Sequence, residues 1–195
     1  MVIGLTGGIG SGKSTAANYF ATFENVSIYN ADKEAKKLMT NSNELKEKII
    51  SLFGKNAYVD NTLNRKFIAN IVFNDIEKLE MLNNIVHPAV HKHLENFVLT
   101  HEANSYILYE NAILFENNSQ FICDKIITVT APKELRIQRV IERDNTTKKA
   151  VEERMKNQWK QSKKVLQSHY IIHNTNLLKT QKNILRIHNI LTTKL

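Results

Sequence analysis

A phosphate-binding pattern occupies residues 7–14, which read GGIGSGKS and satisfy G-x-x-x-x-G-K-[S/T] at every position. The glycines leave few Cβ atoms in the way, so successive backbone N–H groups can turn inward on a polyanion. Lys13 supplies a point charge for β and γ phosphates, and the Ser14 hydroxyl is a suitable Mg²⁺ ligand. A turn that only joins a strand to a helix does not need this Lys-Ser pair. The residues expected to bind a nucleotide are Gly8, Gly10, Ser11, Gly12, Lys13, Ser14 and Thr15.

Asp32 is the first candidate for proton transfer. It follows an apolar stretch expected to be the second strand, and ligands of open α/β sheets bind at the carboxyl ends of the strands. There its carboxylate can accept a proton from an attacking hydroxyl, as a general base does. Asp is also a good helix N-cap, and position alone favours a cap for a helix beginning at Lys33. Both interpretations stay open at this point.

Arg136, Arg139 and Arg143 are spaced by three and four residues, which places them on one stripe of a helix. Such a stripe can neutralise the charge of a transferring phosphoryl group. The alternative is a solvated basic face. The phosphate-binding pattern upstream favours the functional interpretation.

Glu110 ends the apolar run 106–109, and an acidic residue at the tip of a strand beside a phosphate loop can hold Mg²⁺ through water. The metal ligands expected are therefore Ser14 and Glu110. An ordinary strand-end carboxylate is the alternative for Glu110. The histidines show no transition-metal spacing with a cysteine pair, and no Ser-His-Asp pattern is present.

The chain alternates strand and helix patterns around these residues. Short apolar or β-branched runs predict strands at 1–6, 26–29, 106–109, 125–130 and 170–173. Helices are expected at 13–23, after Pro132 and from 176 to the C-terminus. This order predicts an α/β fold with a doubly wound parallel sheet of about five strands, of the P-loop NTPase type. Pro88 is expected to kink or end a helix near His87.

The organisation expected is one domain over 1–195 in three parts. The nucleotide-binding core comprises 1–32, 103–132 and 165–195. Residues 33–102 are too long for a simple crossover, so they are expected to form an inserted helical subdomain that grips a second substrate. Residues 133–164 are expected to form a basic helical lid.

The formal net charge of +8 is concentrated in the lid, where eleven Lys or Arg face five Asp or Glu. This excess suits a lid over phosphates as well as a nucleic-acid surface, but aromatic interleaving is limited there to Trp159. We expect no nucleic-acid partner. No apolar run approaches the ~18 residues that cross a bilayer, no basic residue precedes Lys13, and Cys123 is a single cysteine. We therefore expect a cytoplasmic protein without a membrane partner.

The chain resembles the dephospho-CoA kinase family in an ordered set of motifs that covers about nine tenths of its length. Residues 3–14 are similar to the phosphate loop of that family nearly letter for letter. The further matches are Asn30-Ala31-Asp32, Leu63-Asn64-Arg65, Ile71-Val72-Phe73, His87-Pro88, Ile113-Leu114-Phe115-Glu116, Arg139, Arg143, Gln158 and Asn174.

The resemblance implies ATP-dependent phosphorylation of the ribose 3′-hydroxyl of dephospho-CoA, with ATP and Mg²⁺ as the implied cofactors. Asp32 would be the base, and Lys13, Arg139 and Arg143 would stabilise the transferring phosphoryl group. Asn174 would lie on the ATP side. The substrate-binding residues it implies are Asp32, Arg65, His87 and Glu116.

The chain departs from the usual family pattern at several positions. Asn30 replaces the first aspartate, Arg136 stands at a usual glutamine position, and Ser168-His169 replaces an Ala-Asp pair. None of these removes a group that the implied chemistry requires. Two other classes are compatible with the residues: a nucleoside monophosphate kinase, and a nucleotide-dependent nucleic-acid binder that uses 133–164.

Overall fold

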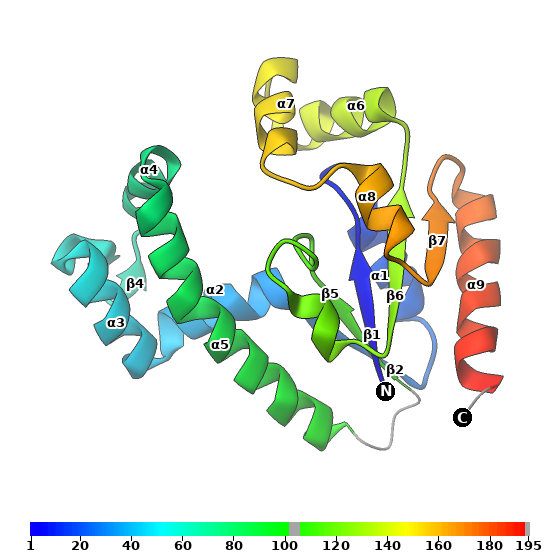
Figure 1. Ribbon diagram of the computed structural model, residues 1–195, viewed down its shortest axis with the longest axis horizontal. Coiled ribbons are helices and arrows are strands. Elements are labelled where there is room, and N and C mark those ends of the chain that lie inside the picture. The colour runs from blue at the N-terminus through cyan, green and yellow to red at the C-terminus, as the bar shows by residue number, and fades with distance from the viewer. Residues whose placement is uncertain (102–105, 194–195) are drawn as a thin grey trace. The chain divides into compact units, whose positions relative to one another are not determined.

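The computed structural model describes residues 1–101 and 106–193 and divides into two compact units (Figure 1). The first unit comprises Met1–Tyr29 and His101–Leu195, and the second comprises Asn30–Thr100. The sequence-based boundaries at Glu102 and at residue 103 lie outside the described residues. The other boundary, expected after Asp32, falls before Asn30, because Asn30 already caps the first helix of the second unit. Within the described ranges, no helix is both long enough and apolar enough to cross a bilayer.

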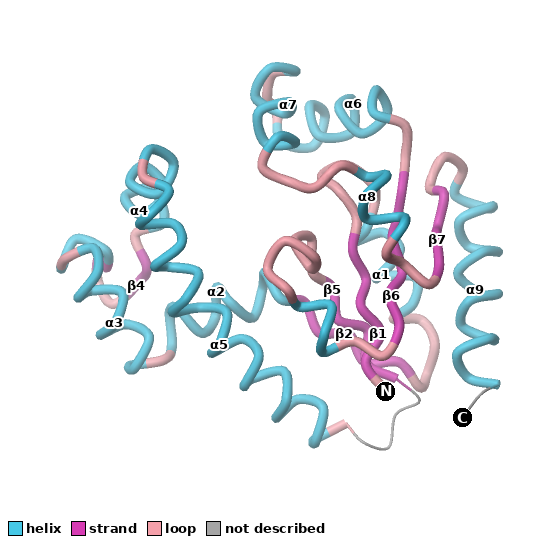
Figure 2. Tube along the Cα trace, in the orientation of Figure 1, coloured by secondary structure: helices cyan, strands magenta, loops and turns pink. Residues whose placement is uncertain are grey.

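The first unit is built on a parallel sheet. Its strands are β1 (Val2–Thr6), β2 (Val26–Asn30), β5 (Tyr106–Glu110), β6 (Lys125–Thr130) and β7 (Tyr170–His173). Across 1–101 and 106–193 this is a five-stranded sheet in the order β2-β5-β1-β6-β7 (Figure 2). β1 pairs in parallel with β5 and β6, and β6 pairs in parallel with β7. The doubly wound parallel sheet predicted from the apolar runs is confirmed.

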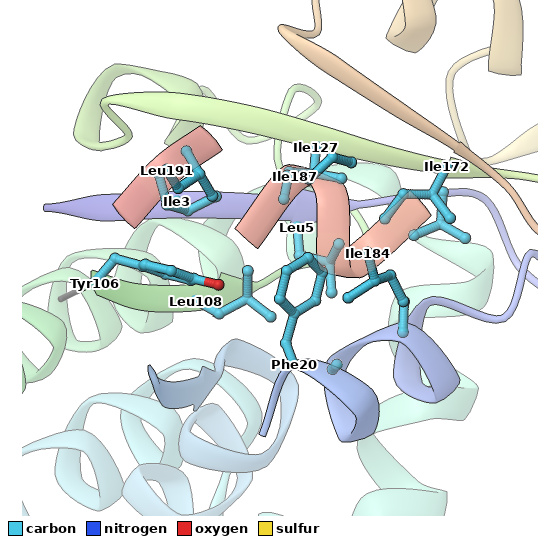
Figure 3. Packing of buried hydrophobic residues seen from close by; sticks show 13 residues of the cluster. Ile3, Leu5, Phe20, Tyr106, Leu108, Ile127, Ile172, Ile184, Ile187 and Leu191 are labelled. Carbon is cyan, nitrogen blue, oxygen red and sulfur yellow. The ribbon is translucent and has the colours of Figure 1, made fainter. Parts of the chain in front are cut away.

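Helices α1 (Lys13–Phe20) and α9 (Leu177–Thr193) pack on this sheet, and the chain beyond Thr193 lies outside the described residues. Figure 3 shows apolar side chains of β1, β5, β6, β7, α1 and α9 meeting in one cluster. Ile3, Leu5 and Phe20 are fully buried there. Complete burial of a side chain of this size contributes about 1.5–3 kcal/mol. This core fixes the carboxyl end of β1, from which the phosphate loop leaves.

The basic stretch 133–164 folds into three helices in the described chain: α6 (Lys133–Asp144), α7 (Lys148–Lys156) and α8 (Gln161–Leu166). Pro132 is the N-cap residue of α6, so a helix begins directly after it, as expected from the sequence. Asn145, with a φ of 48°, ends α6 in the left-handed region. Thr147 then caps α7 by accepting a hydrogen bond from the N–H of Ala150.

The second unit is mainly helical. Its helices are α2 (Ala31–Asn41), α3 (Asn43–Phe53), α4 (Arg65–Asn74) and α5 (Ile76–Thr100), with a short 3-10 turn, η1 (Lys55–Ala57). A small hairpin joins β3 (Tyr58–Val59) to β4 (Thr62–Leu63). Asp60 and Asn61 both have positive φ, as a tight hairpin of this kind requires. Ile49, Phe53 and Ile68 belong to the core of this unit.

Helix α5 runs through Pro88 without ending. Of the two outcomes expected at Pro88, an end of the helix near His87 is therefore wrong, and a kink stays a prediction. A proline inside a helix costs about 3 kcal/mol because it removes one hydrogen bond and crowds the preceding turn. Val86, Val90 and Leu94 are buried on α5, which packs against α2, α3 and α4. This packing outweighs the cost of the proline.

Candidate active site

The phosphate loop connects β1 to α1. Gly10 and Gly12 have φ values of 77° and 84°, a region that favours glycine. Ser11 N–H donates to the carbonyl of Gly8 at 3.0 Å, which closes a tight turn. Gly12 is the N-cap residue of α1, so Lys13 and Ser14 lie in its first turn, where a helix favours anions. Thr15 follows them with an exposed side chain.

The glycines also allow other elements of the first unit to approach the loop. A Cβ at Gly8 would collide with the guanidinium of Arg136, and one at Gly10 would collide with the backbone of Arg136. A Cβ at Gly12 would collide with the side-chain amide of Asn174. Sequence reasoning assigned these glycines to phosphate access only. Their second role depends on contacts between residues far apart in the chain, so the motif does not reveal it.

Lys13, Ser14 and Glu110 meet at the mouth of the loop. The Nζ of Lys13 lies 2.7 Å from Oε1 of Glu110, and the Ser14 hydroxyl donates to the same oxygen at 2.9 Å. Glu110 is 4% exposed and pairs with Leu5 in the β1–β5 register. The sheet itself therefore positions this carboxylate beside the loop.

The oxygens of Ser14 and Glu110 are of the kind that Mg²⁺ prefers. In residues 1–101 and 106–193 no group of three or more His, Cys, Asp or Glu is arranged to hold a metal ion. A Mg²⁺ ion at a kinase site commonly uses one or two protein oxygens together with phosphates and water. The residues present therefore fit Mg²⁺ bound jointly by the protein and a nucleotide.

The three arginines of α6 have different environments. Arg136 is buried, its Nε donates to the carbonyl of Ile9 at 2.8 Å, and burial lowers its pKa. Arg139 donates from Nη2 to the carbonyl of Asn174 at 3.1 Å. Its Nη1 is buried with no hydrogen-bond partner in the described chain, and it would lie 3.7 Å from a Cβ at Gly12. Arg139 thus presents a donor beside the phosphate loop.

Arg143 instead forms a two-point contact with Asp144, at 2.7 and 3.0 Å. Arg154 of α7 donates to the same carboxylate at 2.8 Å. The hydrogen bond from Arg143 is the main cause that lowers the pKa of Asp144 to about 2, and it raises the pKa of Arg143 in return. The structure therefore brings Arg136 and Arg139 to the loop and holds Arg143 at the α6–α7 turn.

Asn174 follows β7, and its side chain is bonded at both ends. Its Nδ2 donates to the carbonyl of Ser11 at 2.9 Å, and its Oδ1 accepts from the Thr180 hydroxyl at 3.2 Å. It is 6% exposed. Asn174 therefore connects the backbone of the phosphate loop to Thr180 of α9.

Glu116 lies close to the lid helices. One of its oxygens accepts the N–H of Trp159 at 2.8 Å, and the carboxylate pairs with the Nζ of Lys164 at 2.8 Å. Lys164 is fully buried and also donates to the carbonyl of Ala112 at 2.7 Å. Burial lowers the pKa of Lys164, and Glu116 opposes that shift. Sequence reasoning missed Lys164, because a lysine within a basic run carries no signal of burial.

The other predicted site residues belong to the second unit. The side-chain oxygen of Asn30 accepts the N–H of Lys33 at 2.9 Å and so caps α2, while Asp32 is exposed in its first turn. The interpretation of Asp32 as the cap is therefore wrong. Arg65 is exposed at the start of α4. His87 is half-buried on α5, and its pKa is lowered by burial and by neighbouring His91.

The chain matches a known protein family over most of its length. A family model described as dephospho-CoA kinase matches residues 1–180. The chain belongs to the dephospho-CoA kinase family. A relative named dephospho-CoA kinase, from Fusobacterium nucleatum, is 36% identical over 183 residues and covers 92% of each chain.

Solved structures agree with the dephospho-CoA kinase fold. A protein from Thermus thermophilus superposes with a TM-score of 0.88 at 29% identity, covering 97% of this chain and 96% of that one. A dephospho-CoA kinase from Campylobacter jejuni gives a TM-score of 0.66 at 26% identity, covering 98% and 97%. The similarity extends over both units of the chain.

Local contacts accommodate a departure from the usual dephospho-CoA kinase pattern. The hydroxyl of Ser168 lies 2.6 Å from that of Thr128 and donates to the carbonyl of Lys164 at 2.8 Å. The Nδ1 of His169 accepts the N–H of Ile126 at 3.1 Å. Ser168 and His169 therefore connect the end of α8 to residues of β6.

Proposed function

We propose that this chain transfers the terminal phosphoryl group of ATP to the ribose 3′-hydroxyl of dephospho-CoA, giving coenzyme A and ADP. The observation that carries the proposal is the meeting of Lys13, Ser14 and Glu110 at a phosphate loop, in a chain of the dephospho-CoA kinase family. The loop supplies backbone N–H groups, a cation and oxygen ligands in one place. These are the parts that phosphoryl transfer from a nucleotide needs.

The donor side is assigned to the loop and α6. We expect Gly8, Gly10, Ser11, Gly12, Lys13, Ser14 and Thr15 to bind the phosphates. Ser14 and Glu110 would hold Mg²⁺, which neutralises charge on the β and γ phosphates when bound. Lys13 would exchange its contact with Glu110 for contacts with phosphate oxygens. Asn174 would act through the loop, because both ends of its side chain already bind the protein.

The buried Nη1 of Arg139 supports its assignment to the transferring phosphoryl group. Arg143 is assigned to the same group, which requires it to leave the carboxylate of Asp144. Arginine at such a position stabilises negative charge without forming a covalent bond.

The acceptor side is assigned to the second unit. Asp32 would accept the proton of the 3′-hydroxyl while the oxygen of that hydroxyl bonds to the γ phosphorus. The bond from phosphorus to the β–γ bridging oxygen breaks, and its electron pair leaves with ADP. An exposed carboxylate that does not cap its helix supports this role. Arg65 and His87 would contact the coenzyme A moiety, whereas the contacts of Glu116 favour a role within the protein.

We further expect small-molecule substrates only, with neither nucleic acid nor membrane as a partner, and action in the cytoplasm. For nucleic acid, tight and salt-sensitive binding of oligonucleotides without acceptor phosphorylation would contradict this expectation.

An acceptor panel tests the proposed function. The purified protein with Mg·ATP is offered dephospho-CoA, CMP or GMP, and ADP and the phosphorylated acceptor are measured by liquid chromatography with mass spectrometry. We expect ADP and coenzyme A to appear together with dephospho-CoA. Phosphorylation of CMP or GMP but not of dephospho-CoA would instead identify a nucleoside monophosphate kinase.

A further inference from the structure

The chain segment 158–164 comprises the end of the linker after α7 and the first turn of α8, and it contacts the phosphate loop directly. The side-chain oxygen of Gln158 accepts the N–H of Ile9 at 2.8 Å. The carbonyl of Ile9 accepts a hydrogen bond from the Nε of Arg136 at 2.8 Å. Both backbone polar groups of Ile9 are thus held by side chains of the lid region, which fixes the path of the loop between Gly8 and Gly10.

Glu116 determines where segment 158–164 lies. Its carboxylate accepts the N–H of Trp159, the residue after Gln158, and pairs with Lys164 at the other end of the segment. The rings of Phe115 and Trp159 stack with centroids 5.8 Å apart and planes 5° apart. The Nζ of Lys163 lies over the Trp159 ring, 3.4 Å from its centroid. The turn after β5 therefore holds segment 158–164 at both ends.

Because Lys164 is buried, breaking its contact with Glu116 is costly. Its side chain is fully buried, and its Nζ contacts Glu116 and the carbonyl of Ala112. Removing one member of a buried ion pair leaves an uncompensated charge, whereas replacing both by uncharged residues of similar size is often neutral. The pair can therefore be removed as a unit, which separates its charge from the hydrogen bond that Glu116 accepts from Trp159.

We propose that Gln158 and Glu116 are positioning residues that preorganise the phosphate loop for ATP. Gln158 holds the amide of Ile9, and the Glu116 oxygen that accepts the N–H of Trp159 holds Gln158 in place. Lys164 compensates the charge of Glu116. This inference rests on the proposed function for the identity of the nucleotide. It assigns Glu116 to the donor side of the reaction, although the family resemblance implied substrate binding.

The first consequence concerns Gln158→Leu, which removes the acceptor for the amide of Ile9. Loss of one hydrogen bond of this kind corresponds to an affinity for ATP about tenfold weaker. The KM for dephospho-CoA should stay within about twofold, a difference smaller than one such hydrogen bond. A purely structural defect would instead lower the fraction of active protein, and so kcat, with both KM values unchanged.

Two double variants test the positioning role of Glu116. Glu116→Gln with Lys164→Met removes the ion pair but keeps an oxygen that can accept the N–H of Trp159. Glu116→Leu with Lys164→Met removes that oxygen as well. The dissociation constant of ATP is measured by isothermal titration calorimetry without any acceptor, and both KM values are measured by steady-state kinetics. The matched control is Glu153→Gln with Lys156→Met, the same exchange at an exposed pair whose side chains are 53% and 69% exposed.

We expect the Gln-containing double variant and the control to bind ATP like the wild type. The Leu-containing double variant should bind ATP about tenfold more weakly, like Gln158→Leu. Equal ATP affinity in all variants, or an equal rise of both KM values, would overturn the inference. If a double variant does not fold, Gln158→Leu alone decides between these outcomes.

The same measurements separate this inference from the proposed function. A wild type that binds ATP but does not phosphorylate dephospho-CoA would refute the proposed function, while the ATP affinities of the variants would still judge the positioning role. A wild type that does not bind ATP would overturn both.

Discussion

Lys13 binds a buried carboxylate that also accepts a hydrogen bond from Ser14. The sheet fixes the position of Glu110. The ammonium of Lys13, held by this carboxylate, therefore has to move only a short distance to contact a phosphate in the loop. Glu110 thereby keeps the ammonium at the mouth of the loop. The lysine of the motif is thus oriented by a residue far away in the sequence.

Replacing Lys13 tests its role in phosphoryl transfer. Lys13→Ala is expected to lower kcat/KM by about 100-fold or more, since one donor to a developing charge is lost. Steady-state kinetics with dephospho-CoA and ATP measures the change. An unchanged rate would show that this loop does not bind the phosphoryl donor.

Asp32→Asn tests the general base. The substitution removes a proton acceptor but not the bulk of the side chain, so ATP binding should persist while turnover falls by about 10²–10⁴-fold. Glu34→Gln, in the same first turn of α2, is the matched control and should keep its turnover. Kinetics and ATP calorimetry distinguish the two effects. Normal turnover by Asp32→Asn would remove it from the mechanism.

At the scale of elements, α6 and the turn after β7 pack so closely against the phosphate loop that a Cβ on the loop glycines would collide with them. Gly10→Ala is expected to weaken ATP binding strongly, because its Cβ would collide with the backbone of Arg136. Gly54→Ala is the matched control: Gly54 also has a positive φ of 81°, but nothing lies within 4 Å of its added Cβ.

Each alanine pays a backbone cost on the order of 1–3 kcal/mol for the unfavourable φ. ATP calorimetry on both variants therefore separates this common cost from the collision at Gly10. Equal ATP affinity for Gly10→Ala and Gly54→Ala would show that the close approach of α6 is not needed for binding.

The sequence predicted the elements with a strong local signal. Short apolar runs such as 106–109 gave the strands, and the glycine-rich motif gave the loop. The lid was expected as one helical stretch, but Asn145 and Thr147 interrupt it. The hairpin at 58–63 was missed because its strands have two residues each, too short for a period-two pattern. The helix does not end at Pro88, because tertiary packing outweighs the local preference for a break.

At the scale of the whole molecule, the order of strands and helices sufficed to predict the doubly wound sheet. The contacts that complete the site were beyond the sequence alone. Gln158 with Ile9, Asn174 with Ser11 and Lys164 with Glu116 each join residues distant in the chain. Only folding brings such pairs together, and no local spacing encodes them.

Four histidines with lowered pKa values predict how stability varies with pH. The pKa values of His87, His91, His169 and His188 are all lowered, with burial as the main cause. An unfolded histidine has a pKa of about 6.5. As pH falls below that value, the unfolded chain binds protons that the folded protein resists, so the free energy of unfolding decreases.

Urea denaturation at pH 7.5, 6.5 and 5.5 measures this effect, and stability should be greatest at pH 7.5 and least at pH 5.5. His188→Gln should reduce the slope, since it removes one of the four groups. Asp144 does not contribute in this range, because its pKa of about 2 places its titration at lower pH. A free energy of unfolding that stays constant or rises towards pH 5.5 would contradict the prediction.

The central claim is that the loop at 7–14 presents the terminal phosphoryl group of ATP for transfer. A crystal structure of the protein with Mg²⁺ and a non-hydrolysable ATP analogue tests it most directly. We predict that the triphosphate lies against the backbone N–H groups of the loop, with the Nζ of Lys13 on the phosphate oxygens and the carboxylate of Asp32 facing the terminal phosphorus. A triphosphate bound elsewhere, with the loop free of it, would contradict the account.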